Sequence, residues 1–166
     1  VLASTHARAD DADDCVKASG ETKITACTRV IESGRWQGAN LVSAYINRGI
    51  AKRHKGDLDG AVADYNSALE LNPRDAYAYN NRGNAKRDKG DLDGAIVDFN
   101  YTIALIPLAP NPYHNRGNVR LDKGDLDGAI ADYSRAIEVD PRYAIAHRVR
   151  GQTRYLKGEY TLATTD

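Results

Sequence analysis

Apolar residues along this chain recur at intervals of three and four positions, with polar residues between them. Because an α-helix turns once every 3.6 residues, this spacing gathers the apolar side chains on one helical face. The pattern predicts an amphipathic helix between Asp57, whose carboxylate can cap the first turn, and Pro73, which cannot continue a helix. Its apolar positions are Leu58, Ala61, Val62, Tyr65, Ala68 and Leu69. Another helix, with Tyr45 and Gly49 on one face, precedes it, so the sequence predicts a pair of helices.

The same helix pair is repeated along the chain. Glycine stands at 49, 83, 117 and 151, and proline at 73, 107 and 141, all in steps of 34 residues. The segment KGDLDGA occurs at 55–61, 89–95 and 123–129, and a weaker form, KGEYTLA, follows at 157–163. A single helix pair leaves an apolar face uncovered, so consecutive units must stack on one another to form a core.

The order of residue types within each unit resembles the tetratricopeptide repeat: an aromatic, a small residue, a second small residue, another aromatic and then a proline. In the first unit these residues are Tyr45, Gly49, Ala61, Tyr65 and Pro73. The resemblance implies an all-α fold, an α-solenoid of antiparallel helix pairs. Its units would span 42–75, 76–109, 110–143 and an incomplete 144–166.

The resemblance also implies a binding site. In this family, residues of the first helix of each pair that face the concave groove hold a partner, commonly an extended peptide. Carried over position by position, the peptide-binding groove consists of Tyr77, Asn80, Asn84, Arg87, Asn111, His114, Asn115, Asn118, Arg148, Gln152 and Tyr155, and the first unit adds Ser43, Ile46, Ile50 and Arg53. Many of these are amides, which can both donate to and accept from a peptide backbone.

One variant of the family grips a carboxy-terminal carboxylate with Lys and Arg beside Asn. Two of the positions match, at Asn84 and Asn115. The cationic positions hold Asn80, Ile145 and Val149 instead, so this mode of binding is not expected.

Arginine and aspartate recur in step with each other as well. The arginines are Arg48, Arg82, Arg116 and Arg150, and the aspartates are Asp64, Asp98, Asp132 and Asp166. We therefore predict an ion pair between the first and second helices of the same or neighbouring units.

The two cysteines precede the first full repeat. Cys15 lies one 34-residue period before Gly49, and Cys27 lies one period before Ala61, the two small residues expected where paired helices touch. This placement predicts a helical hairpin over 10–41 that caps the repeats and carries a Cys15–Cys27 disulfide. The alternative is a pair of buried reduced thiols. Eleven intervening residues without a nearby histidine pair do not suit zinc.

The two ends depart from the repeat. Ala7-Arg8-Ala9 has the small-x-small form of a signal-peptidase site, so residues 1–9 are interpreted as a signal-peptide remnant or a flexible tail. With the disulfide, this favours an exported bacterial protein, periplasmic or secreted. The sequence stops within the second helix of the fourth unit, which indicates either a fragment or an end covered by a partner or a second copy.

The composition of the chain argues against several classes of function. The 23 basic and 23 acidic residues balance, so the chain lacks the basic excess typical of nucleic-acid binders. Its apolar runs are far shorter than the roughly 20 residues of a membrane helix. The repeated DLDG lacks the glutamate that ends a calcium loop, and no catalytic arrangement is apparent. We expect no enzyme activity, cofactor or metal.

These observations favour a non-catalytic protein–protein interaction scaffold that binds a peptide or protein partner in its groove. The alternative is a structural or accessory subunit, docked permanently in a larger complex through its open C-terminal helix or its convex face. A homo-oligomer or a larger complex through the C-terminal end stays open at this point.

Overall fold

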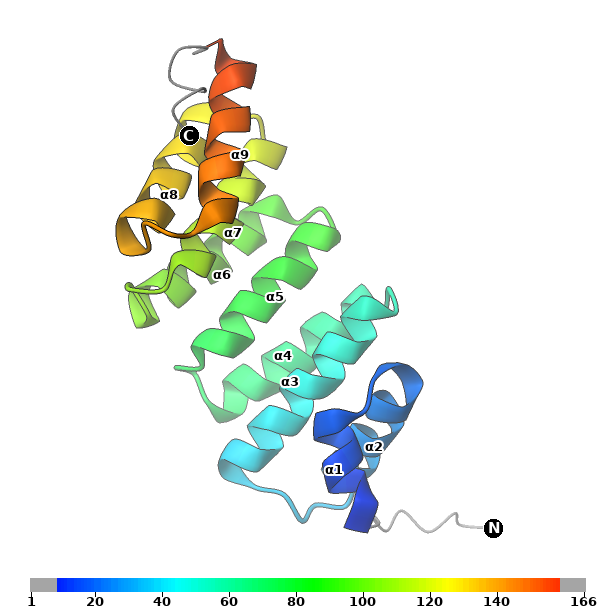
Figure 1. Cartoon of the computed structure of the whole chain (residues 1–166). Helices are drawn as coiled ribbons and strands as arrows, with labels where there is room; N and C mark the ends of the chain where they lie inside the picture. Colours follow the sequence, from blue (N-terminus) through cyan, green and yellow to red (C-terminus); the bar gives the residue numbers. More distant parts are fainter. Residues whose placement is uncertain (1–8, 159–166) are drawn as a thin grey trace. The chain divides into compact units, whose positions relative to one another are not determined.

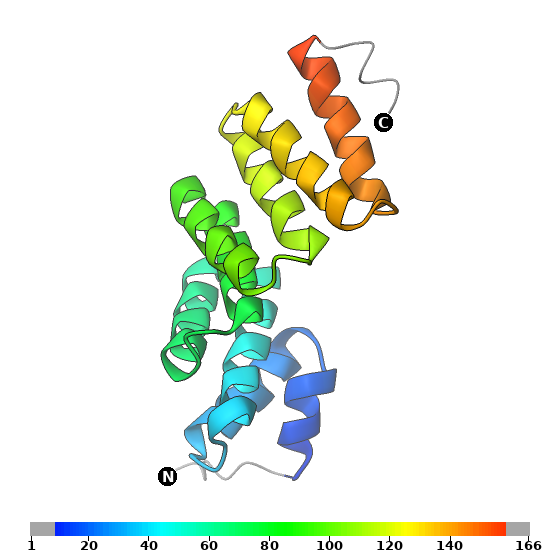
Figure 2. The same cartoon turned by 90° about the vertical axis from the view of Figure 1, so that its left-hand side faces the viewer.

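A computed structural model describes residues 9–158 of the 166-residue chain. Within that range the fold is entirely helical and adjacent helices form antiparallel pairs, which confirms the expected fold class (Figures 1 and 2). The helices are α1 (Ala9–Lys17), α2 (Gly20–Glu32), α3 (Gly38–His54), α4 (Leu58–Leu71), α5 (Ala76–Asp88), α6 (Leu92–Leu105), α7 (Pro110–Asp122), α8 (Leu126–Val139) and α9 (Ala144–Lys157). The chain divides into two compact units, unit 1 (Val1–Ala85) and unit 2 (Lys86–Asp166).

The predicted export-signal remnant falls on residues 1–9, of which 1–8 lie outside the described range and Ala9 begins α1. Residues 159–166, where the fourth repeat was expected to stop short, also lie outside it. These two interpretations therefore stay predictions.

The KGDLDGA segments form the turns between paired helices. In the turn before α8, the Asp125 carboxylate accepts a hydrogen bond from the backbone N–H of Gly128 at 2.9 Å, and Asp57 and Asp91 cap α4 and α6 in the same way. Gly124 has a φ of 79°, a left-handed conformation that residues with a Cβ rarely adopt. The predicted helix caps are thereby confirmed.

Small residues let the paired helices approach closely. A Cβ added to Gly49 of α3 would lie 2.7 Å from Cε1 of Tyr65 in α4, nearer than real side chains come. The same holds for Gly117 of α7 and Tyr133 of α8, where the distance would be 2.6 Å. Glycine is therefore required at these two contacts because the ring of Tyr65 or Tyr133 occupies the space that a Cβ would need.

In unit 1, α1 and α2 form a hairpin that packs on α3. A disulfide joins Cys15 of α1 to Cys27 of α2, as the repeat frame predicted. Both sulfurs are buried in an apolar cluster with Ala26, Val30 and Ala44. The bond holds the hairpin at the position where the later repeats place Gly49 and Ala61.

A buried aspartate of each second helix is paired with cations of the first. In unit 1, Asp64 is only 3% exposed, and its carboxylate accepts hydrogen bonds from Nη2 and Nε of Arg48 at 2.6 and 2.9 Å. The Nζ of Lys52, one turn further along α3, lies 3.0 Å from the same carboxylate. The predicted pairing of the first and second helices is thereby confirmed for this repeat.

In unit 2, Arg116 of α7 donates two hydrogen bonds to the carboxylate of Asp132 in α8, at 2.6 and 2.9 Å. Arg120 forms a further ion pair with the same carboxylate at 3.0 Å. The buried Asp98 of α6 is paired with Lys86 at 2.9 Å. Asp166, the last of the predicted partners, lies outside the described residues.

The same arginines also reach back to the preceding repeat. Nη1 of Arg116 donates to the amide oxygen of Asn100 in α6, at 2.5 Å. Equivalent bonds run from Arg48 to Thr28, from Arg82 to Asn66 and from Arg150 to Ser134. Each of these guanidinium groups therefore connects its own repeat with the second helix of the one before.

The disulfide yields the first prediction. Because both cysteines are bonded, a thiol reagent should detect no reactive thiol in the denatured, unreduced chain. Replacing both, Cys15→Ala with Cys27→Ala, removes a covalent constraint on the unfolded state and should lower the free energy of unfolding by about 3 kcal/mol. Denaturant unfolding followed by circular dichroism measures the loss, and two reactive thiols before reduction would contradict the bond.

The buried carboxylates yield the second prediction. Asp132→Ala leaves Arg116 and Arg120 facing each other without their anion, so it should lower the free energy of unfolding by about 3 kcal/mol. Asp127→Ala is the matched control on the same helix, because its ion pair with Lys157 is exposed and should change stability by less than about 0.5 kcal/mol. Equal effects of the two substitutions, measured by urea unfolding, would disprove a special role for the buried pair.

Candidate protein-binding surfaces

The eleven residues predicted to line a groove are all accessible to solvent within their units. Tyr77, Asn111, Arg148, Gln152 and Tyr155 are exposed, and the others are half-buried. Three of the eleven, in α5, belong to unit 1: Tyr77, Asn80 and Asn84. The remaining eight belong to unit 2, where they lie on the end of α5, on α7 and on α9.

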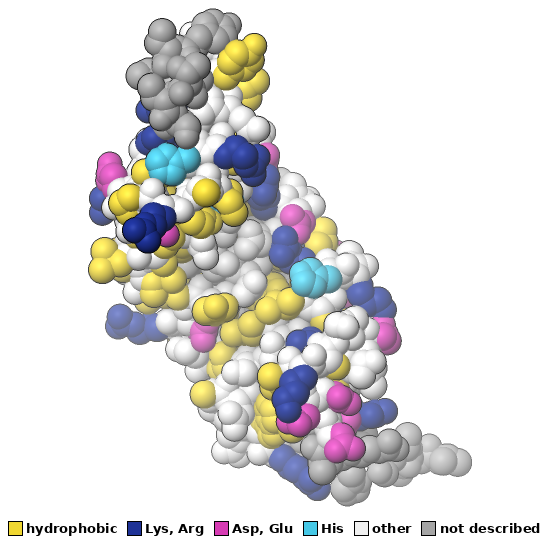
Figure 3. Space-filling view, viewed as in Figure 1, with side chains coloured by type: hydrophobic (Ala, Val, Ile, Leu, Met, Phe, Trp, Pro, Cys, Tyr) yellow, Lys and Arg dark blue, Asp and Glu magenta, His cyan; other side chains and the backbone are white. Residues whose placement is uncertain are grey.

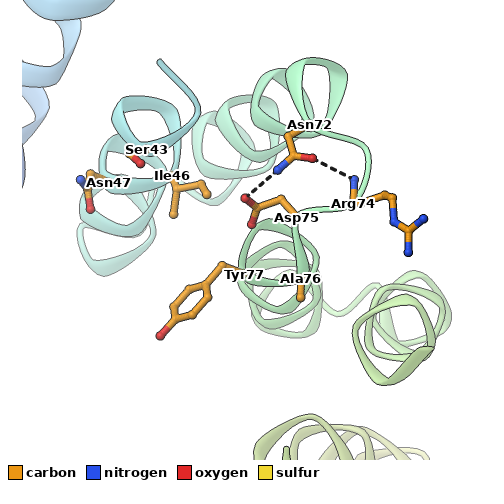
Figure 4. Close-up of a pocket in the computed structure, with 8 residues that line it drawn as sticks. All are labelled: Ser43, Ile46, Asn47, Asn72, Arg74, Asp75, Ala76 and Tyr77. Atoms are coloured by element: carbon orange, nitrogen blue, oxygen red, sulfur yellow. Dashed lines mark hydrogen bonds between the residues drawn. The ribbon is translucent and has the colours of Figure 1, made fainter. Parts of the chain in front are cut away.

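Unit 1 has a pocket of about 440 Å³ where the start of α5 lies beside α3 (Figure 4). It is lined by Ser43, Ile46, Asn47, Asn72, Arg74, Asp75, Ala76 and Tyr77. The pocket brings together three residues that the sequence placed in a groove, namely Ser43, Ile46 and Tyr77. In Figure 4 the ring of Tyr77 projects from α5 into open space, and the side chain is 74% exposed.

Sequence reasoning missed the polar wall of this pocket, which is the turn between α4 and α5. The Asn72 amide donates to the Asp75 carboxylate at 3.3 Å and accepts from the backbone N–H of Arg74 at 3.2 Å. Asp75 also accepts from the backbone N–H of Ala78 at 2.9 Å, which caps the start of α5. The signal was present, because an Asn-Pro-x-Asp turn directly before a helix supplies polar side chains at a helix start.

Unit 2 places His114 of α7 at the centre of a second surface. Its ring lies 5.8 Å from that of Tyr143, edge to face, and 6.0 Å from that of Tyr133. The Asn118 amide nitrogen lies 3.3 Å from His114 Nε2, and its oxygen accepts a hydrogen bond of 2.8 Å from the Tyr133 hydroxyl. Asn118 was predicted as a groove amide, and in the structure it holds the ring of His114 in place. The sequence identified Tyr133 as an apolar position of its helix and did not single out Tyr143.

Cations surround this histidine. Burial lowers the pKa of His114, a hydrogen bond with Asn115 opposes the shift, and the charges of Arg87 and Arg148 lower it further. The imidazole is therefore neutral near pH 7, and two positive side chains lie close enough to lower its pKa. Arg87, at the end of α5, also pairs with Asp122 at the end of α7, where Nε and Oδ2 are 2.5 Å apart.

The Tyr133 hydroxyl keeps its proton throughout the physiological range. Burial raises its pKa to about 12, with a smaller contribution from Asp122 and an opposing one from Arg87. The phenol can thus act as a permanent donor to Asn118. We call His114, Asn115, Asn118, Arg87 and Arg148 the His114 surface. Asn111, Gln152 and Tyr155 are exposed on α7 and α9, and Gln152 lies one helical turn after Arg148, at the edge of this surface.

Charges of both signs are interspersed over the face of the molecule drawn in Figure 3. Within residues 9–158, the structure contains no cluster of His, Cys, Asp and Glu that could hold a metal ion. Over the same range no helix is long and apolar enough to cross a membrane.

Antiparallel helix pairs that recur every 34 residues, with a glycine against an aromatic ring in the α3–α4 and α7–α8 pairs, define a helical-repeat protein of the solenoid class. The family model for the TPR repeat matches residues 49–86 and 117–158. The chain belongs to the tetratricopeptide-repeat family, whose members are protein-interaction modules. No curated protein matches its sequence.

Several solved structures share this fold. A crystal structure of the protein MamA is 24% identical, with a TM-score of 0.80 over 94% of this chain and 84% of that one. MamA from Desulfovibrio magneticus RS-1, from residue 41 to the end, is 20% identical, with a TM-score of 0.79 over 93% and 85%. The first TPR of Spaghetti (RPAP3), bound to an HSP90 peptide, is 21% identical, with a TM-score of 0.69 over 74% and 97%. At these identities the similarity concerns the fold alone.

The environment of His114 yields the third prediction. The pKa of this imidazole, followed by NMR, should lie below its ordinary value of 6.5. As the pH falls below 6.5, the unfolded chain takes up a proton at this ring before the folded chain does. The stability that the neutral ring contributes is therefore present above pH 6.5 and lost as the pH falls towards the lowered pKa.

The variant His114→Gln should show a smaller loss of stability than the wild type between pH 7.5 and pH 5. His54→Gln, which removes an exposed histidine at the end of α3, is the control and should keep the wild-type profile. A pKa of His114 at or above 6.5 would contradict the proposed environment.

Proposed function

We propose that this chain is a non-catalytic protein-interaction scaffold that binds extended segments of a partner polypeptide through the first helices of its repeats. Membership of the tetratricopeptide-repeat family supports this function. So does the similarity in fold to the RPAP3 domain, which was solved with a peptide bound. The observation that carries the proposal is the His114 surface, where amides and two arginines are accessible on the first-helix side of unit 2.

The chemistry of the His114 surface favours a particular kind of peptide segment. The exposed amides Asn111, on the helix of His114, and Gln152, on the helix of Arg148, can exchange hydrogen bonds with a peptide backbone. The exposed Arg148 attracts an acidic side chain, whereas the charge of Arg87 is already balanced in part by Asp122. The proposed ligand is therefore an extended segment that carries at least one carboxylate.

The pocket of unit 1 serves as a separate subsite in this proposal. Ile46, Ala76 and the ring of Tyr77 give it an apolar wall, and the turn at Asn72 gives it a polar one. Its volume of about 440 Å³ suits one or two side chains of a partner rather than a whole helix. Tyr77 is a large, exposed aromatic of the kind that anchors protein interfaces.

We also propose that the protein acts outside the cytoplasm, in a bacterial periplasm or secreted. The support is the Cys15–Cys27 disulfide, since such bonds persist in oxidising compartments and are rare in the cytosol. The Ala7-Arg8-Ala9 segment agrees with export.

The fourth prediction tests the His114 surface directly. A photo-crosslinking amino acid at Gln152, exposed on α9, should capture a polypeptide partner from a periplasmic extract. The same crosslinker at Arg142, exposed in the turn before α9, is the matched control and should not capture it.

The captured partner then allows a quantitative measurement. Arg148→Glu should weaken its binding at least tenfold in calorimetry, because it turns attraction for a carboxylate into repulsion. Arg142→Glu makes the same change of net charge away from this surface and should leave the affinity unchanged. Equal binding by the wild type and Arg148→Glu would refute the surface as the binding site.

A further inference from the structure

The outer side of α6 differs from the outer sides of α4 and α8. At positions related by the 34-residue period, α4 and its following turn carry Ser67, Glu70, Asn72 and Arg74. The corresponding residues of α8 and its turn are Arg135, Glu138, Asp140 and Arg142. The corresponding residues of α6 and its turn are Tyr101, Ala104, Ile106 and Leu108. Polar and charged residues have thus been replaced by apolar ones in this repeat alone.

These apolar side chains are exposed. Val97 is 50% exposed, Tyr101 53%, Ile106 40% and Leu108 82%. Val97, Tyr101 and Ala104 follow one another at intervals of four and three residues, so they share one face of α6. Ile106 and Leu108 follow in the turn towards α7. We call Val97, Tyr101, Ala104, Ile106 and Leu108 the α6 patch.

The α6 patch lies in an uncharged part of the sequence. Residues 99–115 contain no Asp, Glu, Lys or Arg, although 28% of the whole chain is charged. The corresponding stretches, 65–81 and 133–149, each contain several charged residues. The nearby Asp98 is buried and paired with Lys86, and Asp93 is paired with Lys123. The patch therefore presents no charge of its own that could select an oppositely charged partner.

The α6 patch is large enough to form the apolar centre of a protein–protein interface. Its exposed side chains present on the order of 400 Å² of apolar surface, the size of the largest apolar patch on a typical monomer, and such a patch is often functional. A stable dimer buries roughly 800 Å² on each copy, of which the centre is apolar and the rim polar. The patch supplies about half of that area, and polar residues around it can supply the rim.

We propose that the α6 patch is a homodimer interface, on which the same patch of a second copy packs about a two-fold axis. In such an interface every residue near the axis meets its own counterpart, so a charged patch would face like charges. A patch without charge avoids this repulsion, and its apolar side chains gain from mutual burial. A second copy is thus the partner that these residues fit.

The fifth prediction tests this interface. Light scattering after size exclusion, with 1 to 100 µM wild-type protein, should give a mass approaching twice the 18.1 kDa of the chain as the concentration rises. Tyr101→Arg with Leu108→Arg gives α6 the residues that α8 already carries at Arg135 and Arg142, so the repeat should still fold. This variant should remain a monomer over the whole range, with dimer affinity reduced at least a hundredfold.

A second variant leaves the tyrosine in place. Ile106→Asp with Leu108→Arg copies Asp140 and Arg142 into the turn after α6 and should also give a monomer. Tyr77→Arg and Tyr155→Arg are the controls, because both tyrosines are as exposed as the patch but lie on first helices. Both controls should dimerise like the wild type, and circular dichroism confirms that all four variants are folded.

Two outcomes would overturn the proposal. A wild-type chain that is monomeric at 100 µM has no such interface. A dimer that survives both patch variants, or that is lost in Tyr77→Arg or Tyr155→Arg, forms through another surface. Neither outcome bears on the His114 surface, which is tested separately through Arg148.

Discussion

The fold depends on a buried carboxylate in the second helix of each of the first three repeats, Asp64, Asp98 and Asp132, held by cations from the first helix. Burying a carboxylate is costly unless ion pairs and hydrogen bonds replace its water. Asp132 obtains both from Arg116 and Arg120, and only when α7 and α8 lie at one particular separation and register. The pair is therefore a specific constraint on geometry, whereas apolar contact alone would tolerate sliding of one helix along the other. Because the third nitrogen of Arg116 reaches Asn100, the constraint extends from one repeat to the previous one.

This polar constraint explains why the apolar core can be so small. Gly117 and Ala129 are small residues of α7 and α8, and the ring of Tyr133 packs against Gly117. The N-terminal hairpin solves the same problem with a covalent bond between Cys15 and Cys27 at the equivalent contact. The hairpin also has a buried carboxylate, Asp11, paired with Arg29. Here the carboxylate belongs to the first helix and the cation to the second, the reverse of the arrangement in the repeats. The hairpin therefore has a covalent link where the later repeats have only packing contacts.

Much of this architecture follows from the sequence, because it repeats. Three features are visible in the sequence because their residues recur every 34 positions: the cap at Asp125, the close contact at Gly117 and the pairing of Arg116 with Asp132. Recurrence of a residue at this spacing indicates that it has the same structural role in each repeat. Features that occur once could not be read in this way. Asn118 has the Tyr133 hydroxyl as its partner, but the equivalent pairs are Ile50 with Tyr65 and Asn84 with Phe99, so no periodic signal linked amide to phenol. Among the described residues the Tyr65 hydroxyl is indeed buried without a hydrogen-bond partner. The groove amides were predicted from the family, and the sequence alone did not distinguish an amide available to a ligand from one engaged inside the protein.

The repeats differ mainly where the constraint does not apply. The inward positions are fixed by the carboxylate pair and the aromatic ring, so substitution there costs stability. The outward positions of both helices contribute little to that network and can take on separate chemistry in each repeat. In unit 2 this gives a first-helix side with His114 and Arg148 among amides, and a second-helix side on α6 with Tyr101 and Leu108. The former suits a polar, extended polypeptide and the latter a second apolar surface. Because the α6 patch and the His114 surface are built from different helices, the proposed dimer does not use the residues proposed to bind a partner.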